Sequence, residues 1–89
     1  MVIKYTKHVY DKLKLPEIIE LKINLETIAG VLNNPTTVDK SINPHQSIGI
    51  LSKSLSLSVI WKIESDIITE ITFYPAKKGR YESKILRRR

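Results

Sequence analysis

Apolar and polar residues alternate most regularly along the stretch from Ser54 to Tyr81. Its first half places an apolar residue at every second position: Leu55, Leu57, Val59, Trp61 and Ile63. A strand turns successive side chains to opposite faces, so this pattern predicts a strand with one apolar face and with Trp61 in the core. Ser65 and Asp66 follow, and short polar side chains of this kind favour a tight turn. The stretch therefore begins as the first arm of a predicted hairpin.

The return arm continues the alternation. It is expected to place four residues on one face, namely Ile67, Thr69, Ile71 and Phe73, and four on the other, namely Ile68, Glu70, Thr72 and Tyr74. Pro75 is expected to end the pairing, because proline has no backbone N–H to donate. The hairpin then leads into a basic segment that contains Arg80 and Tyr81.

Upstream of the hairpin, the pattern changes to helical spacing. Val2 to Tyr5 predicts a short strand, and Lys7 to Leu15 predicts a helix with Thr6 as its N-cap. Asn24 is expected to cap a second helix, which Asn33-Asn34-Pro35 closes. Glu17 to Leu21 is too short to assign. Two further short strands are expected at Thr36 to Asp39 and at Ser47 to Leu51, with a turn-like connection at Ile42 to Gln46.

These elements predict an α+β fold in the order β-α-α-β-β-β-β. Short links join the last four strands, so they are expected to pair antiparallel. Two N-terminal helices would then pack on one face of a mostly antiparallel sheet of four to five strands. We expect one domain over residues 1–86, followed by a basic tail over residues 87–89.

Charge is distributed unevenly along the chain, whose formal net charge is +6. Residues 77–89 hold seven basic side chains against Glu82, which gives +6, while the first 76 residues hold eight basic and eight acidic side chains. Charge concentrated in this way predicts an anionic partner at one end of the molecule. A solvated tail that only aids solubility is the alternative interpretation.

Composition excludes several kinds of metal site and of membrane protein. The chain has no cysteine, which leaves no disulfide framework and no thiolate metal site, and two isolated histidines do not build a structural zinc site. We therefore expect no metal and no cofactor. No apolar run reaches about 18 residues and no signal peptide is apparent, so we expect a cytoplasmic protein that does not cross a membrane.

Three segments together resemble the RelE-type toxin superfamily, and in particular a branch of small RelE-fold domains. They are YTKHVYDKL (Tyr5 to Leu13), VLNNP (Val31 to Pro35) and ITFYPAKKGRYE (Ile71 to Glu82). The resemblance implies a compact basic domain that cleaves RNA without a metal, an endoribonuclease of the mRNA interferase type. It also implies RNA as partner, with ribosome association and a blocking antitoxin protein, and it leaves a homodimer open. The early helices are short and balanced in charge here, which departs from the ribosome-bound members.

The candidate catalytic residues are His8, Arg80 and Tyr81. Cleavage of a phosphodiester needs a base, an acid and fixed positive charge. The imidazole of His8 suits either proton role, Arg80 suits a phosphate held by two hydrogen bonds, and Tyr81 suits base stacking or proton positioning. The candidate substrate-binding residues are Lys12, Lys62, Lys77, Lys78 and Lys84. Lys12 lies one helical turn after His8 and is expected on the same side.

Two other functions stay open. One is a nucleic-acid-binding module that uses the same basic end without catalysis. The other is a degenerate toxin that acts only in protein–protein association, through an apolar face made by Ile60, Ile68 and Tyr74. Each candidate residue also has a structural interpretation: His8 and Lys12 as solvated helix residues, and Tyr81 as a ring packed on the sheet edge.

Overall fold

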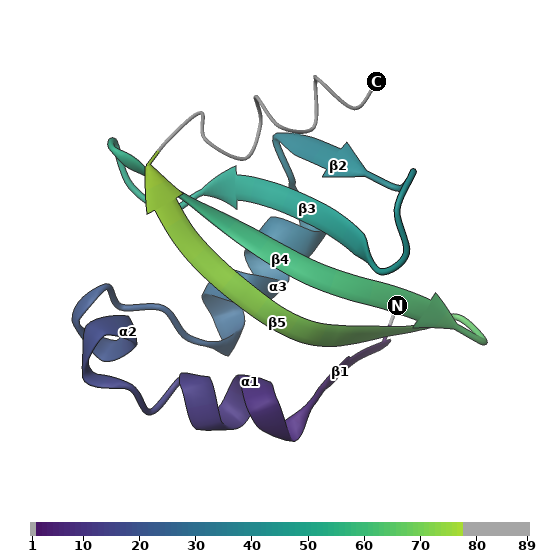
Figure 1. Cartoon of the computed structure of the whole chain (residues 1–89), viewed down its shortest axis with the longest axis horizontal. Coiled ribbons are helices and arrows are strands. Elements are labelled where there is room, and N and C mark those ends of the chain that lie inside the picture. Colours follow the sequence, from purple (N-terminus) through teal and green to yellow (C-terminus); the bar gives the residue numbers. More distant parts are fainter. Residues whose placement is uncertain (1, 78–89) are drawn as a thin grey trace.

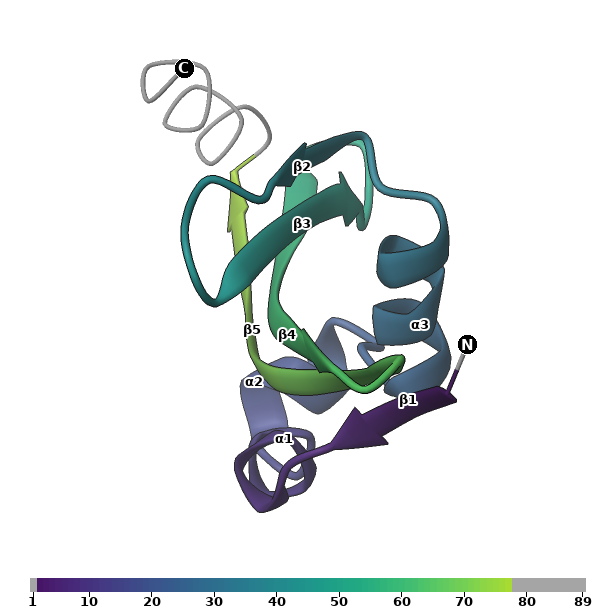
Figure 2. The same ribbon diagram turned by 90° about the vertical axis from the view of Figure 1, so that its right-hand side faces the viewer.

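The computed structural model describes residues 2–77 of the 89-residue chain. Its elements are β1 (Val2–Tyr5), α1 (Lys7–Lys12), α2 (Pro16–Glu20), α3 (Leu25–Asn33), β2 (Thr37–Asp39), β3 (His45–Ile50), β4 (Leu55–Glu64) and β5 (Ile67–Lys77). The strands form one sheet in the order β1-β5-β4-β3-β2, in which β1 runs parallel to β5 and every other pair is antiparallel. Figures 1 and 2 show α3 behind the curved sheet and α1 beside the β5 edge.

The predicted α+β class and the mostly antiparallel sheet are confirmed. The order differs by one element, because residues Pro16–Glu20 form a separate short helix. Pro16 occupies its first position, where the missing N–H costs nothing, and Leu15 precedes it in an extended conformation. Strand β3 starts at His45, inside the segment expected to be a turn.

The predicted hairpin and its turn are confirmed. Ser65 and Asp66 both have positive φ, 49° and 65°, as a two-residue turn with the twist of a hairpin requires. Pro75 does not end the pairing, however: it lies opposite Leu57, and the ladder continues to Lys77 opposite Leu55. Strand β1 pairs with β5 only from Ile67 to Glu70, so β5 has a neighbouring strand on one side only at Pro75. A proline without an N–H is tolerated at such an edge.

A β-bulge corrects the predicted faces of the return strand. Ile60 pairs with Thr72 and Trp61 pairs with Glu70, so that Ile71 is an extra residue in β5. Residues directly opposite one another share a face, and the bulge therefore places Glu70 with Trp61 and Phe73 with Val59 on the core side. The predicted patch of Ile60, Ile68 and Tyr74 is not formed, because Ile68 packs against the core.

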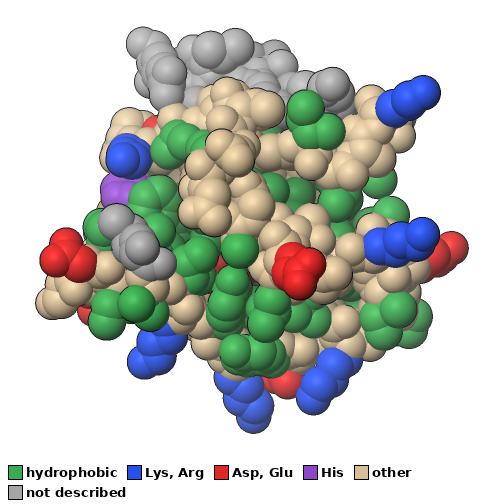
Figure 3. All heavy atoms as spheres, turned by 180° about the vertical axis from the view of Figure 1, so that it is seen from behind, with side chains coloured by type: hydrophobic (Ala, Val, Ile, Leu, Met, Phe, Trp, Pro, Cys, Tyr) green, Lys and Arg blue, Asp and Glu red, His purple; other side chains and the backbone are tan. Residues whose placement is uncertain are grey.

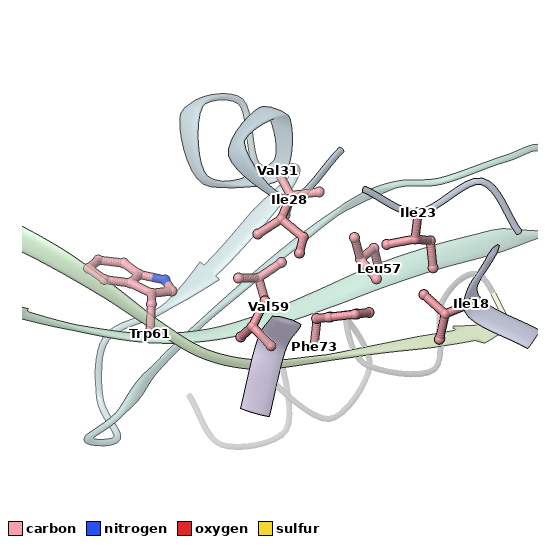
Figure 4. Packing of buried hydrophobic residues seen from close by; sticks show 9 residues of the cluster. Ile18, Ile23, Ile28, Val31, Leu57, Val59, Trp61 and Phe73 are labelled. Carbon is pink, nitrogen blue, oxygen red and sulfur yellow. The ribbon is translucent and has the colours of Figure 1, made fainter. Parts of the chain in front are cut away.

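The core lies between this face of the sheet and the helices (Figure 4). Its buried members are Val9, Ile18, Ile23, Ile28, Val31, Leu57, Val59, Trp61 and Phe73. Trp61 is in the core as predicted, and its indole N–H donates to the Ser47 hydroxyl at 2.8 Å. The imidazole of His45 packs edge-on against the Trp61 ring, with centroids 4.9 Å apart.

The two predicted N-caps behave differently. Asn24 caps α3 through a capping box: its side-chain oxygen accepts from the Thr27 N–H at 3.0 Å, and the Thr27 hydroxyl accepts from the Asn24 N–H at 3.3 Å. Thr6 precedes α1 as predicted, but its side chain makes no cap hydrogen bond to the helix. Its hydroxyl donates instead to the carbonyl oxygen of Ile71 in β5, at 3.1 Å. Within residues 2–77, no helix has the length and apolar content needed to cross a membrane.

At Gly49 the sheet lies close against the Val31 side chain of α3. A Cβ added there would meet the Val31 side chain at 2.8 Å, whereas a Cβ at Gly30 would meet nothing within 4 Å. We expect Gly49→Ala to lower the free energy of unfolding by about 1–3 kcal/mol through overpacking. Gly30→Ala, inside α3, should raise it by about 0.5–1 kcal/mol. Urea denaturation followed by circular dichroism measures both, and equal effects of the two substitutions would contradict this packing.

Candidate functional site

The segment from Thr6 to Lys12 covers the edge of β5 beyond the last residue paired with β1. The Thr6 N–H donates to the Glu70 carbonyl at 3.3 Å, and the Thr6 hydroxyl donates to the next carbonyl, that of Ile71. The Lys12 ammonium donates to the carbonyl of Phe73. Exposed edge carbonyls invite pairing with other chains, so these contacts both protect the edge and fix α1 beside it.

Helix α1 and the residues after it form an open depression of about 260 Å³, lined by His8, Asp11, Lys12 and Leu15. We call it the His8–Lys12 depression. The prediction that His8 and Lys12 share one side of their helix is confirmed, because both line it. Figure 3 shows the helix side of the molecule, where hydrophobic side chains gather and lysine and acidic side chains project around them.

Lys12 is held by aromatic rings as well as by the Phe73 carbonyl. Its Nζ lies 4.0 Å from the centroid of the Tyr74 ring and 5.0 Å from that of Phe73. Ring faces attract a cation, so this arrangement fixes the ammonium beside a partly exposed aromatic side chain. Burial lowers the pKa of Lys12, while the nearby Glu70 charge acts in the opposite direction.

Glu70 is the ionisable residue that sequence reasoning missed. Its side chain is fully buried, and within residues 2–77 neither carboxylate oxygen makes a hydrogen bond of ordinary geometry. Burial raises the pKa of Glu70 to about 8, against the opposing effects of the Lys12 charge and the Thr72 backbone amide. The folded protein therefore holds this carboxyl mostly neutral at pH 7.

The alternation of side chains predicted for β5 did not reveal that Glu70 is buried. Regular alternation turns Glu70 away from the core, and nothing in the residues around it signals the extra residue at Ile71. Tyr5 lies beside Glu70 in the parallel ladder. The pKa of Tyr5 is raised by burial first, then by the charges of Glu70 and Tyr10.

Of the predicted binding lysines that the structure describes, Lys12 lines the depression, whereas Lys62 and Lys77 do not. Lys62 lies opposite Thr69 and pairs with Glu64 at 2.8 Å, close to the hairpin turn. Lys77 lies at the far end of β5, opposite Leu55. At about 3.3 Å per residue, Thr69 and Lys77 are roughly 26 Å apart along the strand. Lys12 contacts β5 between them, so the three lysines are spread along the hairpin.

Four predicted site residues, Lys78, Arg80, Tyr81 and Lys84, lie outside the described residues. A shared catalytic role requires Arg80 to lie close to His8, and this proximity therefore stays a prediction. Among residues 2–77, no three His, Cys, Asp or Glu side chains lie close enough together to hold a metal ion.

Comparison with known proteins identifies no relative: no family model, no curated protein and no solved structure matches the chain.

The buried carboxyl makes stability depend on pH. The Glu70 pKa is raised from 4.5 to about 8 on folding. The contribution of the protonated carboxyl to the free energy of unfolding is therefore fully present below pH 4.5 and is lost as pH rises toward 8. At pH 7 the loss amounts to about 3 kcal/mol, since each pKa unit corresponds to about 1.4 kcal/mol. We expect Glu70→Gln to raise stability by about this amount at pH 7 and to change it little at pH 4.

Denaturation by urea at pH 4, 5.5, 7 and 8 measures this effect. Glu20→Gln is the matched control, because Glu20 is exposed near the end of α2 and its replacement should change stability by less than about 0.5 kcal/mol. Parallel pH profiles for the wild type and Glu70→Gln would show that the carboxyl titrates at its ordinary pKa.

Proposed function

We propose that this chain is an RNA-binding domain of the RelE-like type that cleaves RNA without a metal ion, with the His8–Lys12 depression as its reaction site. The observation that carries the proposal is the arrangement around that depression. His8 and Lys12 line it together, and the Lys12 ammonium rests on the half-exposed ring of Tyr74. A proton-transfer group, a fixed cation and a stacking surface are the parts that RNA cleavage requires.

The roles follow from the chemistry of each group. His8 takes the proton of the 2′-hydroxyl, whose oxygen then attacks the neighbouring phosphorus and displaces the 5′ oxygen of the next nucleotide. Lys12 stabilises the negative charge that develops on the phosphate oxygens. The departing 5′ oxygen takes a proton from water, so the products are a 2′,3′-cyclic phosphate and a 5′-hydroxyl. Arg80 and Tyr81 belong to the same proposal, as a second phosphate contact and as the group that positions the leaving-group proton.

The arrangement of the chain supports the RelE-like part of the proposal. An N-terminal strand and helices precede four strands that pair antiparallel in succession, with helices packed on one face. The seven basic residues of positions 77–89 add an anion-attracting segment that begins with Lys77, the last residue of β5.

Incubation of the purified full chain with end-labelled single-stranded RNA in EDTA tests the activity. We expect fragments that end in a 2′,3′-cyclic phosphate. His8→Ala should lower the cleavage rate by about 10²-fold or more, as loss of a general acid or base does. Lys12→Ala should lower it less, because it removes one charge. The matched control is Lys40→Ala, which removes an exposed charge beside β2, at the opposite edge of the sheet from α1.

If the RNA stays intact but binds tightly and in a salt-dependent way, the chain is a non-catalytic binding module and not an enzyme. Cleavage that persists in His8→Ala would show that the depression is not the reaction site. Absence of both binding and cleavage would leave protein–protein association as the remaining function.

A further inference from the structure

The Glu70 side chain is fully buried on the core side of β5, three residues before the Phe73 carbonyl to which the Lys12 ammonium donates. RNA cleavage as proposed makes no use of this carboxyl. From β1, Tyr5 faces it, and from α1 the charged group that acts on it is Lys12. From β4, the opposing residue is Trp61, whose N–H is already bonded to Ser47. On β5 itself, the Thr72 backbone amide is the nearby donor. Among residues 2–77, Lys12 is therefore the cation that responds to the charge of Glu70.

Lys12 and Glu70 interact without forming an ion pair. Among the residues that the structure describes, the ion pair within 4.0 Å joins Lys62 to Glu64. The Lys12 ammonium instead donates to the Phe73 carbonyl and rests on the Tyr74 ring. This arrangement suits a neutral Glu70, because a neutral carboxyl needs no counter-ion and leaves the ammonium at the rim of the depression.

Ionisation of Glu70 changes this balance. A buried carboxylate with no hydrogen-bond partner is strongly unfavourable, and pairing with a cation is the usual compensation. Lys12 has a flexible stem of four carbons, so its ammonium can exchange the Phe73 carbonyl for the carboxylate. Whether or not it moves, the new negative charge cancels its field at the depression.

We propose that Glu70 is the positioning residue for Lys12: neutral, it leaves the ammonium at the rim of the depression, and ionised, it draws the ammonium inward and cancels its charge. The affinity of the depression for an anion then falls as pH rises through the titration of Glu70. The consequence for RNA rests on the proposed function, whereas the link between Glu70 and Lys12 does not.

Nuclear magnetic resonance of the free protein tests the link itself. We expect the ¹³Cε and ¹⁵Nζ shifts of Lys12 to show a step near the Glu70 pKa of about 8 and to lose this step in Glu70→Gln. Lys40 is the control resonance and should show no such step in either protein. A Lys12 step that persists in Glu70→Gln, or that is missing from the wild type, would overturn the proposal.

A second variant keeps the test decisive if Glu70→Gln folds poorly. Lys12→Met retains the apolar stem and removes the charge that favours ionised Glu70. The titration of the Glu70 carboxyl carbon should therefore move to higher pH in Lys12→Met. An unchanged titration would show that the two groups are independent, which contradicts the proposal.

Binding of a 2′-O-methyl oligoribonucleotide, which lacks the attacking hydroxyl, tests the consequence. Between pH 6.5 and pH 9, wild-type affinity should fall several-fold and the slope of its salt dependence should decrease by about 0.7, as for the loss of one phosphate contact. Glu70→Gln should keep its affinity. If the affinity of both proteins for the oligonucleotide depends on pH in the same way, Glu70 does not control anion binding at the depression. A Lys12 step without oligonucleotide binding supports the positioning role and refutes the RNA function.

Discussion

The extra residue in β5 is the constraint on which the site depends. Strand β5 has to turn Phe73 toward the core opposite Val59 and also turn Ile68 toward the core opposite Ile63. Five positions separate these two residues, and an odd separation places them on opposite faces of a regular strand. The bulge at Ile71 reconciles them, and it takes Glu70 to the core side as a consequence. The apolar packing of two neighbours thus accounts for a buried carboxyl.

The same part of β5 has backbone carbonyl groups that β1 does not pair with, and the N-terminal segment forms hydrogen bonds to them. Strand β1 is only four residues long and stops pairing at Glu70, where the bulge changes the direction of the strand. Thr6 bonds to two consecutive carbonyls there, and Lys12 bonds to a third. A threonine that would otherwise cap its own helix joins α1 to the sheet instead. This connection places α1 and the ammonium of Lys12 beside β5, and the depression lies along the same helix.

Electrostatics at this edge are set by burial more than by pairing. Glu70 and Lys12 both have pKa values displaced toward their neutral forms, and burial is the larger cause in each case. Such displacement is common at functional sites, where groups need to exchange protons near neutral pH. By contrast, the exposed Lys62–Glu64 pair near the hairpin turn is of the kind that contributes little to stability. The two groups whose pKa values are displaced in this way therefore lie on β5 and on the helix attached to its edge.

Local patterns in the sequence predicted much of the fold. Alternation marked β4 and its apolar face, Ser65-Asp66 marked the turn, and Asn24 marked the start of α3, because each depends on residues close together in the chain. The shared side of His8 and Lys12 was equally local, since it follows from one helical turn. Tertiary structure alone decided the partner of β1, the bulge at Ile71 and the burial of Glu70. The pairing of β1 with β5 joins segments more than 50 residues apart, and the bulge arises from packing across the β4–β5 hairpin. No local pattern of apolar and polar residues records which edge a strand will join or where an extra residue will be accommodated.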